Sequence, residues 1–441
     1  KQVEKLTNYT DYDVRTLQGR NNELSYEYKG GLYILHTDSK KTNAVKISVQ
    51  ADILYKRPRY EEMRRGINAF TISPTGQRAL FESRGEIFSV PKEKGEARNL
   101  SQSPGSHERF PAWSPNGKYI SYISDKKGKY ELVLRDQLGK DEPIYIPLGA
   151  SHFYFESTWS PDSKKLFYND SHLNLYYVDI QTKKVTKVAS DELSSQTNRT
   201  RNHFQPTWSP DSKWIGYVKA LDNGVRTLFM YELASQRSTQ VTDGMSAVNQ
   251  PTFSREGKYL FFTASTNTGL TNSGLHMSAY EKNVAYNVYA FLLSKDTPSF
   301  VKNESDEEKV IADKSEEKTE KENTKADKNA EKAGNKEKKK DSLGIKVDFD
   351  ALNNRIVALG MSPGYYTLDG STENMLTFKR GSSIGVYDLE KMEERVLVDN
   401  ARSFALSADG KMMIYSNGAS YYMVKAGQKP APDAGKLNLD N

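Results

Sequence analysis

The chain of 441 residues contains no cysteine, few histidines and no long apolar run. The lack of cysteine excludes disulfides and thiolate chemistry, and it is compatible with either a reducing or an oxidising compartment. No stretch approaches the roughly 18 apolar residues that indicate a membrane-spanning helix. Lys1 begins no charged and then apolar export signal, so we expect that an exported protein would have lost its signal.

The six histidines lie singly along the chain, without the spacing of metal ligands. They are His36, His107, His152, His172, His203 and His276. We interpret each of them as a loop or rim residue rather than a ligand. No glycine-rich phosphate loop occurs. The sequence therefore predicts no metal-binding and no cofactor-binding residue in this chain.

One short segment fits the pattern of a nucleophile elbow, Gly381-Ser382-Ser383-Ile384-Gly385. That chemistry needs a strand, a strained turn and a helix, with an acid and a histidine later in the chain. No histidine follows the segment, and the sequence on both sides is typical of strands. We therefore predict a β-hairpin at this place, and no catalytic residue.

The net charge of +6 is modest for this length, and its distribution is uneven. Residues Lys302 to Asp341 are almost all Lys, Glu, Asp and small polar residues, without an aromatic side chain. Such a segment buries too little apolar surface to become ordered, so we predict a disordered, solvated insert. Elsewhere no basic stripe is interleaved with aromatic residues, and nucleic acid is not indicated as a partner.

A five-residue phrase recurs six times and gives the strongest indication of the fold. The copies are Ser73-Pro74-Thr75-Gly76-Gln77, Ser114-Pro115-Asn116-Gly117-Lys118, Ser160-Pro161-Asp162-Ser163-Lys164, Ser209-Pro210-Asp211-Ser212-Lys213, Ser254-Arg255-Glu256-Gly257-Lys258 and Ser407-Ala408-Asp409-Gly410-Lys411. The first five are spaced by about 41 to 49 residues, the period of a four-stranded propeller blade. Proline fixes φ, Asp or Asn caps the turn, and Gly or Ser relaxes the backbone. We predict a hairpin between the innermost and second strands of each blade.

The units add up to one ring of seven four-stranded blades. They begin near Asn68, Glu108, Glu156, Phe204, Asn249, Lys346 and Ala401. The sixth lacks a clean copy of the phrase, and we assign Ile356–Leu359 and Ser383–Tyr387 to it, with strands on both sides of the charged insert. An aromatic residue precedes most turn serines, and we predict that Trp113, Trp159 and Trp208 are buried between adjacent blades. An exposed aromatic binding face is the alternative.

The predicted class is therefore all-β, with three parts. Residues 1–65 are expected to form the end of a preceding propeller module and a linker, because a blade-like stretch there has no turn phrase. Residues 66–428 form the seven-bladed propeller, including the insert at 302–341, and residues 429–441 form a tail. A ring of eight blades that includes the first stretch is the alternative.

The order of these features resembles tricorn protease and its bacterial homologues. Residues Ala69–Phe88 resemble the first blade of that family's seven-bladed propeller. Residues Ala285–Leu293, followed by the charged run and Asp348–Asp350, resemble its passage from the fifth to the sixth blade. Residues Arg355–Leu359 and Met361–Tyr366 resemble its sixth blade.

The resemblance implies the non-catalytic propeller portion of a serine peptidase that degrades peptides. It implies catalytic domains beyond Asn441, so no catalytic residue is transferred to this chain, and the expected role is a substrate-access filter or a docking domain. The implied partners are peptide substrates and the protein's own catalytic domains. Homo-oligomers of the full-length protein are possible, and neither nucleic acid nor a membrane is expected as a partner. The expected location is periplasmic or secreted, with the cytoplasm as the alternative.

Two other functions stay open at this point. One is an adaptor propeller that binds a protein partner on one face, and the other is the propeller of a prolyl-oligopeptidase-type enzyme. If the filter is correct, the inner strands line the route of the substrate. The candidate segments are Ala69–Ile72, Phe110–Ala112, Ser157–Thr158, Pro206–Thr207 and Pro251–Thr252.

Overall fold

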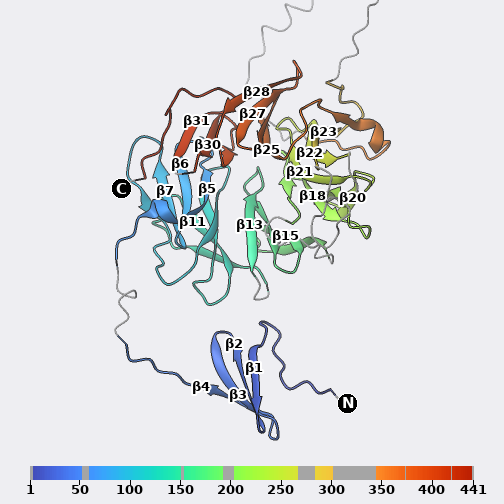
Figure 1. Ribbon diagram of the computed structural model, residues 1–441. Helices are drawn as coiled ribbons and strands as arrows, with labels where there is room; N and C mark the ends of the chain where they lie inside the picture. The colour runs from blue at the N-terminus through green and yellow to red at the C-terminus, as the bar shows by residue number, and fades with distance from the viewer. Residues whose placement is uncertain are drawn as a thin grey trace, which may run out of the picture.

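A ring of seven antiparallel sheets, preceded by a separate four-stranded sheet, makes up the computed structural model of the chain (Figure 1). The structure describes residues 3–51, 59–149, 153–191, 203–266, 284–300, 344–372, 374–418 and 420–439. Among these residues the only helical elements are two single turns of 3₁₀ helix, η2 (Met63–Gly66) and η5 (Leu352–Arg355). The predicted all-β class is confirmed.

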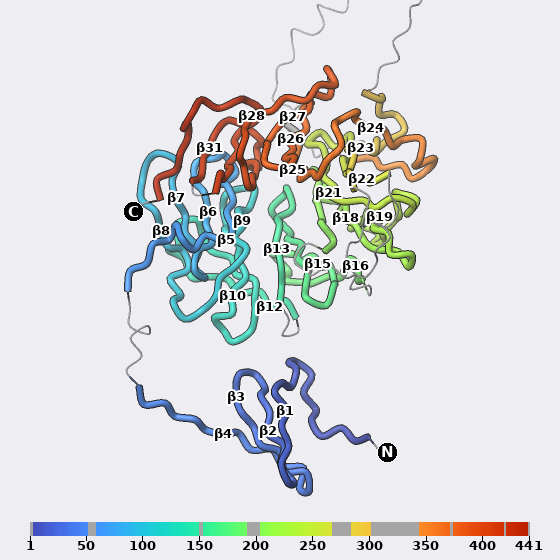
Figure 2. Tube along the Cα trace, in the orientation of Figure 1, coloured from blue at the N-terminus to red at the C-terminus, as the bar shows by residue number. Residues whose placement is uncertain are grey.

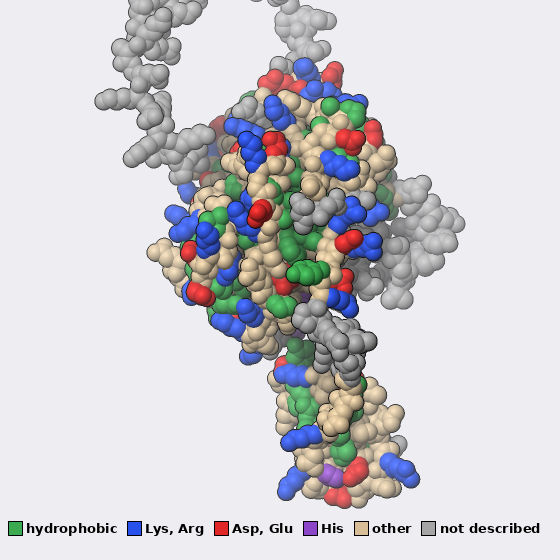
Figure 3. Space-filling view, turned by 90° about the vertical axis from the view of Figure 1, so that its left-hand side faces the viewer, with side chains coloured by type: hydrophobic (Ala, Val, Ile, Leu, Met, Phe, Trp, Pro, Cys, Tyr) green, Lys and Arg blue, Asp and Glu red, His purple; other side chains and the backbone are tan. Residues whose placement is uncertain are grey.

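The first sheet contains β1 (Arg15–Arg20), β2 (Glu23–Tyr28), β3 (Gly31–His36) and β4 (Lys41–Val45) in this order. One of its faces is covered by the chain that precedes it, and the Tyr9 ring stacks on Tyr28 with 3.7 Å between ring centroids. Leu32 and Val45, which pair in adjacent strands, are exposed. In a view from the side, this sheet projects from the ring (Figure 3).

The blades follow one another in chain order around the ring (Figure 2). The first four are β5 (Ile67–Ile72), β6 (Arg78–Ser83), β7 (Glu86–Pro91) and β8 (Arg98–Asn99); β9 (Arg109–Trp113), β10 (Tyr119–Ser124), β11 (Glu131–Asp136) and β12 (Ile144–Pro147); β13 (Tyr154–Trp159), β14 (Lys165–Asp170), β15 (Asn174–Asp179) and β16 (Val185–Ser190); and β17 (Thr207–Trp208), β18 (Trp214–Ala220), β19 (Arg226–Glu232) and β20 (Arg237–Gln240). The last three are β21 (Ala247–Phe253), β22 (Tyr259–Ser265), β23 (Asn287–Leu292) and β24 (Ile356–Ala358); β25 (Tyr366–Thr372), β26 (Met375–Arg380), β27 (Ser383–Asp388) and β28 (Glu393–Val398); and β29 (Ser403–Leu406), β30 (Met412–Ser416) and β31 (Tyr421–Lys425).

The ring closes between the seventh blade and the first, where β29 and β30 contact β5. The Tyr421 ring meets Phe70 and Phe81 edge-on, with centroids 5.2 and 4.9 Å away. The first sheet takes no part in this closure, so the seven-bladed prediction is confirmed and the eight-bladed alternative is wrong.

The seventh blade differs from the prediction because its sheet has three strands rather than four. Beside its outer strand β31 runs a segment that was expected to be part of a tail. The Met423 N–H donates to the Gly435 carbonyl (2.8 Å), the Leu437 N–H donates to the Tyr421 carbonyl (2.8 Å), and the Leu437 side chain is buried. This segment therefore occupies the outer edge of the seventh blade.

The assignment of the charged insert to the sixth blade is wrong. Strand β24 pairs with β23, which makes Ile356–Ala358 the outer strand of the fifth blade. All four strands of the sixth blade follow it in sequence, so the insert interrupts the fifth blade between its third and fourth strands. The insert itself, residues 302–341, lies outside the described residues. The chain leading into β24 packs beside the fourth blade, where the Phe349 ring lies 5.8 Å from that of Trp214.

The tryptophans that precede the turns of the second, third and fourth blades fill the space between two blades, as predicted. Trp113 packs with Leu80 and Ile87 of the first blade, and Trp159 with Ile123 and other residues of the second. Trp208 stacks on Phe167 of the third blade at 5.7 Å. The three indoles are 8%, 4% and 7% exposed, so the alternative of an exposed aromatic face is wrong for them.

Replacing Trp159 by Ala should lower the free energy of unfolding by about 3 to 5 kcal/mol, because it opens a cavity between the second and third blades. Chemical denaturation measures this change. The matched control is Tyr365→Ala, which removes a ring that is 67% exposed and should change stability by less than about 1 kcal/mol. Equal effects of the two substitutions would contradict the assigned packing.

Candidate functional site in the central cavity

Each turn phrase is stabilised by hydrogen bonds of a buried serine hydroxyl. In the third blade, Ser160 Oγ donates to Asp162 Oδ1 (2.5 Å) and accepts a hydrogen bond from the Lys165 N–H (2.9 Å). Ser163 then adopts a left-handed conformation with φ of 59°, the place that glycine occupies in most other copies. All six turn serines are buried, as expected for hydroxyls that replace the missing backbone partners of a tight turn.

Adjacent turns are joined to one another by hydrogen bonds. The Asn116 N–H donates to Ser163 Oγ, and the Asp162 N–H donates to Ser212 Oγ, both at 3.0 Å. At the closure of the ring, the Asp409 N–H donates to the Pro74 carbonyl at 3.1 Å. The turns form a rim at one end of the ring, in which these bonds join the second, third and fourth blades, and the seventh blade to the first.

Behind this rim lies a cavity of about 660 Å³ whose wall contains residues of all seven blades. The lining residues are Thr71, Ile72, Pro74, Pro111, Ala112, Trp113, Pro115, Glu156, Ser157, Thr158, Trp159, Pro161, Phe167, Gln205, Pro206, Thr207, Trp208, Pro210, Gln250, Pro251, Thr252, Phe253, Arg255, Leu368, Asp369, Gly370, Leu406, Ser407 and Ala408. Each of the five inner segments predicted to line a route contributes at least two residues. The structure thus brings these predicted segments together around one space.

Four inner strands share a feature that the sequence did not predict. The residue four positions before the turn serine has a positive φ: Phe110 (56°), Glu156 (37°), Gln205 (44°) and Gln250 (55°). The strand pairing shifts at this place in the second, third and fifth blades, as in a β-bulge. Non-glycine residues in this conformation are strained, and such strain is concentrated at functional positions. Three of the four, all except Phe110, line the cavity.

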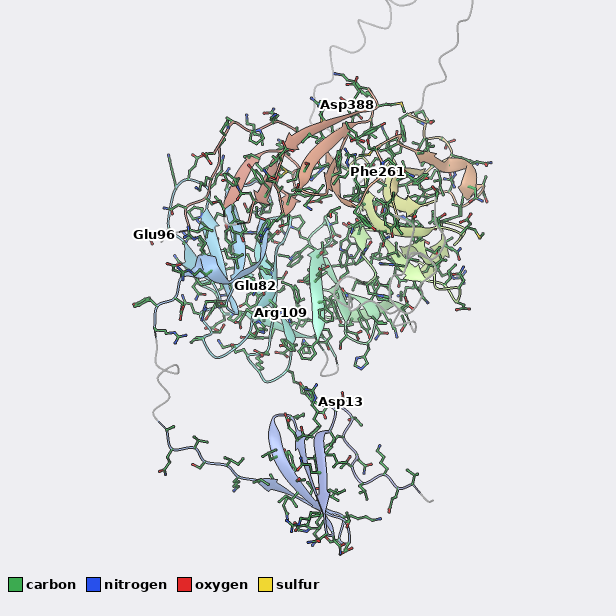
Figure 4. The ribbon with its side chains drawn as sticks, in the orientation of Figure 1. Asp13, Glu82, Glu96, Arg109, Phe261 and Asp388 are labelled. Carbon is green, nitrogen blue, oxygen red and sulfur yellow. The ribbon has the colours of Figure 1, made fainter. Side chains whose placement is uncertain are left out.

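Neighbouring blades hold these residues in place. The Phe110 N–H donates to Glu82 Oε2 of the first blade at 2.9 Å, and the Gln250 N–H donates to Gln205 Oε1 of the fourth blade at 2.6 Å. Glu82 lies on β6 of the first blade and Arg109 on β9, the inner strand of the second (Figure 4). The bulges are therefore part of the contacts between blades.

Charged groups in the cavity wall are few. Arg255 replaces the proline of the fifth turn phrase and donates from Nη2 to the Ser407 carbonyl of the seventh blade at 3.0 Å, so it reaches across the sixth blade. Burial raises the pKa of Asp369, while the positive charge of Arg255 opposes that rise. Asp369 also accepts a hydrogen bond from the Leu406 N–H (3.0 Å). Together the two residues take the place of the turn phrase that the sixth blade lacks.

The segment 381–385 is a hairpin, as predicted, because it joins β26 to β27 and leads into no helix. His203 lies in a loop before β17, but its burial was not predicted. Its side chain is buried, and Nε2 lies 2.7 Å from Asp191 Oδ2, which also accepts from the Ala220 N–H. His152 and His276 lie outside the described residues.

Within the described part of the chain, no three acidic, histidine or cysteine side chains are placed to hold a metal ion. The same residues include no helix long and apolar enough to cross a membrane. The central cavity, to which all seven blades contribute, is the candidate functional site.

Comparison with known proteins agrees with this architecture. Residues 67–427 match the family model of the tricorn protease second beta propeller domain. A tricorn-like protease C-terminal subunit from Sulfurisphaera tokodaii is 22% identical over 432 residues, which cover 94% of this chain and 44% of that protein. A tricorn protease homolog from Saccharolobus solfataricus is 21% identical over 417 residues, covering 93% of this chain and 35% of that protein.

Among solved structures, the crystal structure of tricorn protease has the same fold, with a TM-score of 0.64 at 15% identity. The similarity covers 100% of this chain and 40% of the other. The chain thus spans less than half the length of these relatives.

Replacing Arg255 by Met should destabilise the ring by about 3 kcal/mol at pH 7.5, because it leaves the Asp369 carboxylate in the cavity wall without its cation. The sign of the pH dependence follows from the raised pKa of Asp369. Its ionised form is disfavoured in the fold, so acidification through that pKa neutralises the carboxyl group and reduces the loss.

Urea denaturation at pH 7.5 and pH 5 measures both effects. The double variant Arg255→Met/Asp369→Asn is the control, since it removes the uncompensated charge and should recover part of the stability at pH 7.5. A loss that is independent of pH and unchanged in the double variant would show that Arg255 acts only through its carbonyl contacts.

Proposed function

The chain belongs to the family of the tricorn protease second β-propeller domain, and from this premise we propose that it is the substrate-access filter of a tricorn-like serine peptidase. The observation that carries the proposal is the central cavity, to which every blade contributes. An extended peptide can enter a space of this kind, whereas a folded protein cannot. Filtering would then be steric, with a weak electrostatic component from the few charged groups of the wall.

In this proposal the catalytic serine, histidine and acid belong to parts of the protein beyond residue 441. The partners are peptide substrates and the protein's own catalytic domains, and the full-length protein forms homo-oligomers. The proposed location is the periplasm or the exterior of the cell. These points rest on the family and on the share of the relatives' length that this chain covers.

An adaptor role is the second candidate. The rim supports it, because linked turns of constant geometry offer a rigid surface to a protein partner. The cavity favours the filter, since an adaptor that binds on one face has no use for an inner wall with strained residues from three blades.

The 441-residue chain alone should hydrolyse no peptide, whereas the full-length protein should cleave short peptides. A fluorogenic peptide assay on both proteins at equal concentration measures this difference. Hydrolysis by the purified 441-residue chain, persisting through repeated purification, would place a catalytic group within it and contradict the proposal.

Narrowing the cavity should slow the full-length enzyme. Thr158 lines the cavity and is exposed, so Thr158→Trp adds bulk there without compressing the core. Turnover of long peptides should fall several-fold more than turnover of dipeptide-sized substrates. The matched control is Val396→Trp, which adds the same ring at an exposed position on β28, the outer strand of the sixth blade.

If folded Thr158→Trp enzyme cleaves long peptides at the wild-type rate, the filter is wrong and the adaptor becomes the better explanation. Circular dichroism and thermal unfolding of both variants establish that the ring is intact.

A further inference from the structure

Two glutamines on adjacent blades line the cavity next to one another. Gln205 precedes β17 of the fourth blade, and Gln250 lies on β21 of the fifth. Both residues are half-buried, and both have a positive φ, of 44° and 55°. The Gln250 N–H donates to Gln205 Oε1 at 2.6 Å, so the two residues are held together across the boundary between the blades.

This hydrogen bond fixes the orientation of the Gln205 carboxamide, because only its oxygen can accept from an N–H. Among the described residues, neither Gln205 Nε2 nor the carboxamide of Gln250 has a hydrogen-bond partner. None of these atoms belongs to the unpaired side-chain atoms that are closed off from solvent. They therefore keep accessible surface in the cavity wall, where a ligand can bond to them.

The backbone beside the two glutamines offers fewer donors than an ordinary strand. Pro206 and Pro251 follow them, line the cavity and have no N–H. An incoming peptide therefore cannot pair with these inner strands through an uninterrupted backbone ladder. Its hydrogen bonds at this place depend on side chains.

The wall between the fourth and fifth blades is polar but uncharged. Among the described residues that line the cavity, the charged ones are Glu156, Arg255 and Asp369, and none of them lies on β17 or β21. Arg255, in the turn after β21, donates to the Ser407 carbonyl at 3.0 Å. This part of the wall is consequently suited to neutral groups that form hydrogen bonds rather than to ions.

We propose that Gln205 and Gln250 form a subsite for the main chain of an extended, uncharged peptide. A peptide group has one N–H and one carbonyl, and a carboxamide has the complementary acceptor and donor. Gln205 Nε2 donates to a carbonyl oxygen of the peptide, and the Gln250 carboxamide bonds to the N–H and the carbonyl of a neighbouring peptide group. The subsite rests on the proposed function and adds main-chain recognition, independent of side-chain charge, to a steric filter.

Calorimetric titration of the 441-residue chain with N-acetyl-tetra-alanine amide tests the subsite. Gln250→Met removes the carboxamide and keeps a side chain of similar length, and it should raise the Kd about 3- to 10-fold, the effect of one lost hydrogen bond. The second probe is the same peptide with every alanine nitrogen methylated. It should bind the wild-type chain more weakly, and Gln250→Met should change its Kd less, because that peptide has no alanine N–H to donate.

Gln205→Glu separates the two roles of Gln205. The carboxylate still accepts from the Gln250 N–H, but an acceptor replaces the Nε2 donor. Glu156 has the equivalent position in the third blade with φ of 37°, so this backbone is compatible with a glutamate. The variant should stay folded by circular dichroism and should bind both probes more weakly, because both have carbonyl oxygens.

Gln236→Met is the matched control for Gln250→Met. Gln236 also has φ of 55°, but it is exposed in the turn between β19 and β20 and does not line the cavity. The same substitution there should leave the Kd of both probes unchanged.

Absence of saturable binding to the wild-type chain, or equal Kd values for wild type and Gln250→Met, would overturn the subsite. An equal loss with both probes would also overturn it, since Gln250 would then act only through the shape of the wall. None of these results affects the filter, which is tested by turnover in Thr158→Trp. Binding that depends on Gln250 together with normal turnover in Thr158→Trp would refute the filter and keep the subsite.

Discussion

Burial between neighbouring sheets is the interaction on which the rest of this structure depends. A four-stranded blade has two faces and cannot cover either of them by itself, so its apolar side chains are buried only when another blade packs against it. The residue before each turn serine shows how this works, since Trp159 belongs to the third blade but packs in the cluster of the second. Closure follows from the same constraint. The contacts of Tyr421 with Phe70 and Phe81 complete the ring without a strand shared between the first and last blades.

Much of the ring could be predicted because the turn phrase is a local feature with a local cause. A buried serine hydroxyl and a residue with positive φ occur in every copy, and a proline in four of the six, and each of these favours a tight turn. The fifth and sixth blades could not be divided in this way. The sixth has no turn phrase, and the interaction of Arg255 with Asp369 that replaces it joins residues more than a hundred positions apart. The sequence near Ile356–Ala358 also does not indicate which strand it pairs with, because its partner β23 lies on the other side of the insert.

The sequence predicted which segments line the cavity, but not the conformation of the residues in its wall. The inner segments were expected to line it because they precede the turn phrases. The left-handed conformation of Gln205 and Gln250 was not expected, since a following proline disfavours the right-handed helical region without favouring a positive φ. Glu156 is followed by Ser157, so its sequence gives no sign of this conformation at all. The burial of His203 was missed for a similar reason. Its partner Asp191 lies 12 residues earlier, before the loop that leads to His203, and a single histidine gives no sign of such a pair.

The bulges connect the stability of the ring with the properties of its cavity. A regular inner strand would alternate its side chains between the two faces of the blade, both of which are buried against neighbours, and few polar groups could then reach the axis. The bulge breaks that alternation at one residue, and the cost in backbone strain is offset by hydrogen bonds to the preceding blade, such as that from the Gln250 N–H to Gln205 Oε1. Polar side chains can therefore line the cavity because the packing between blades holds them there. A change that loosened this packing would consequently alter the cavity wall before it opened the ring.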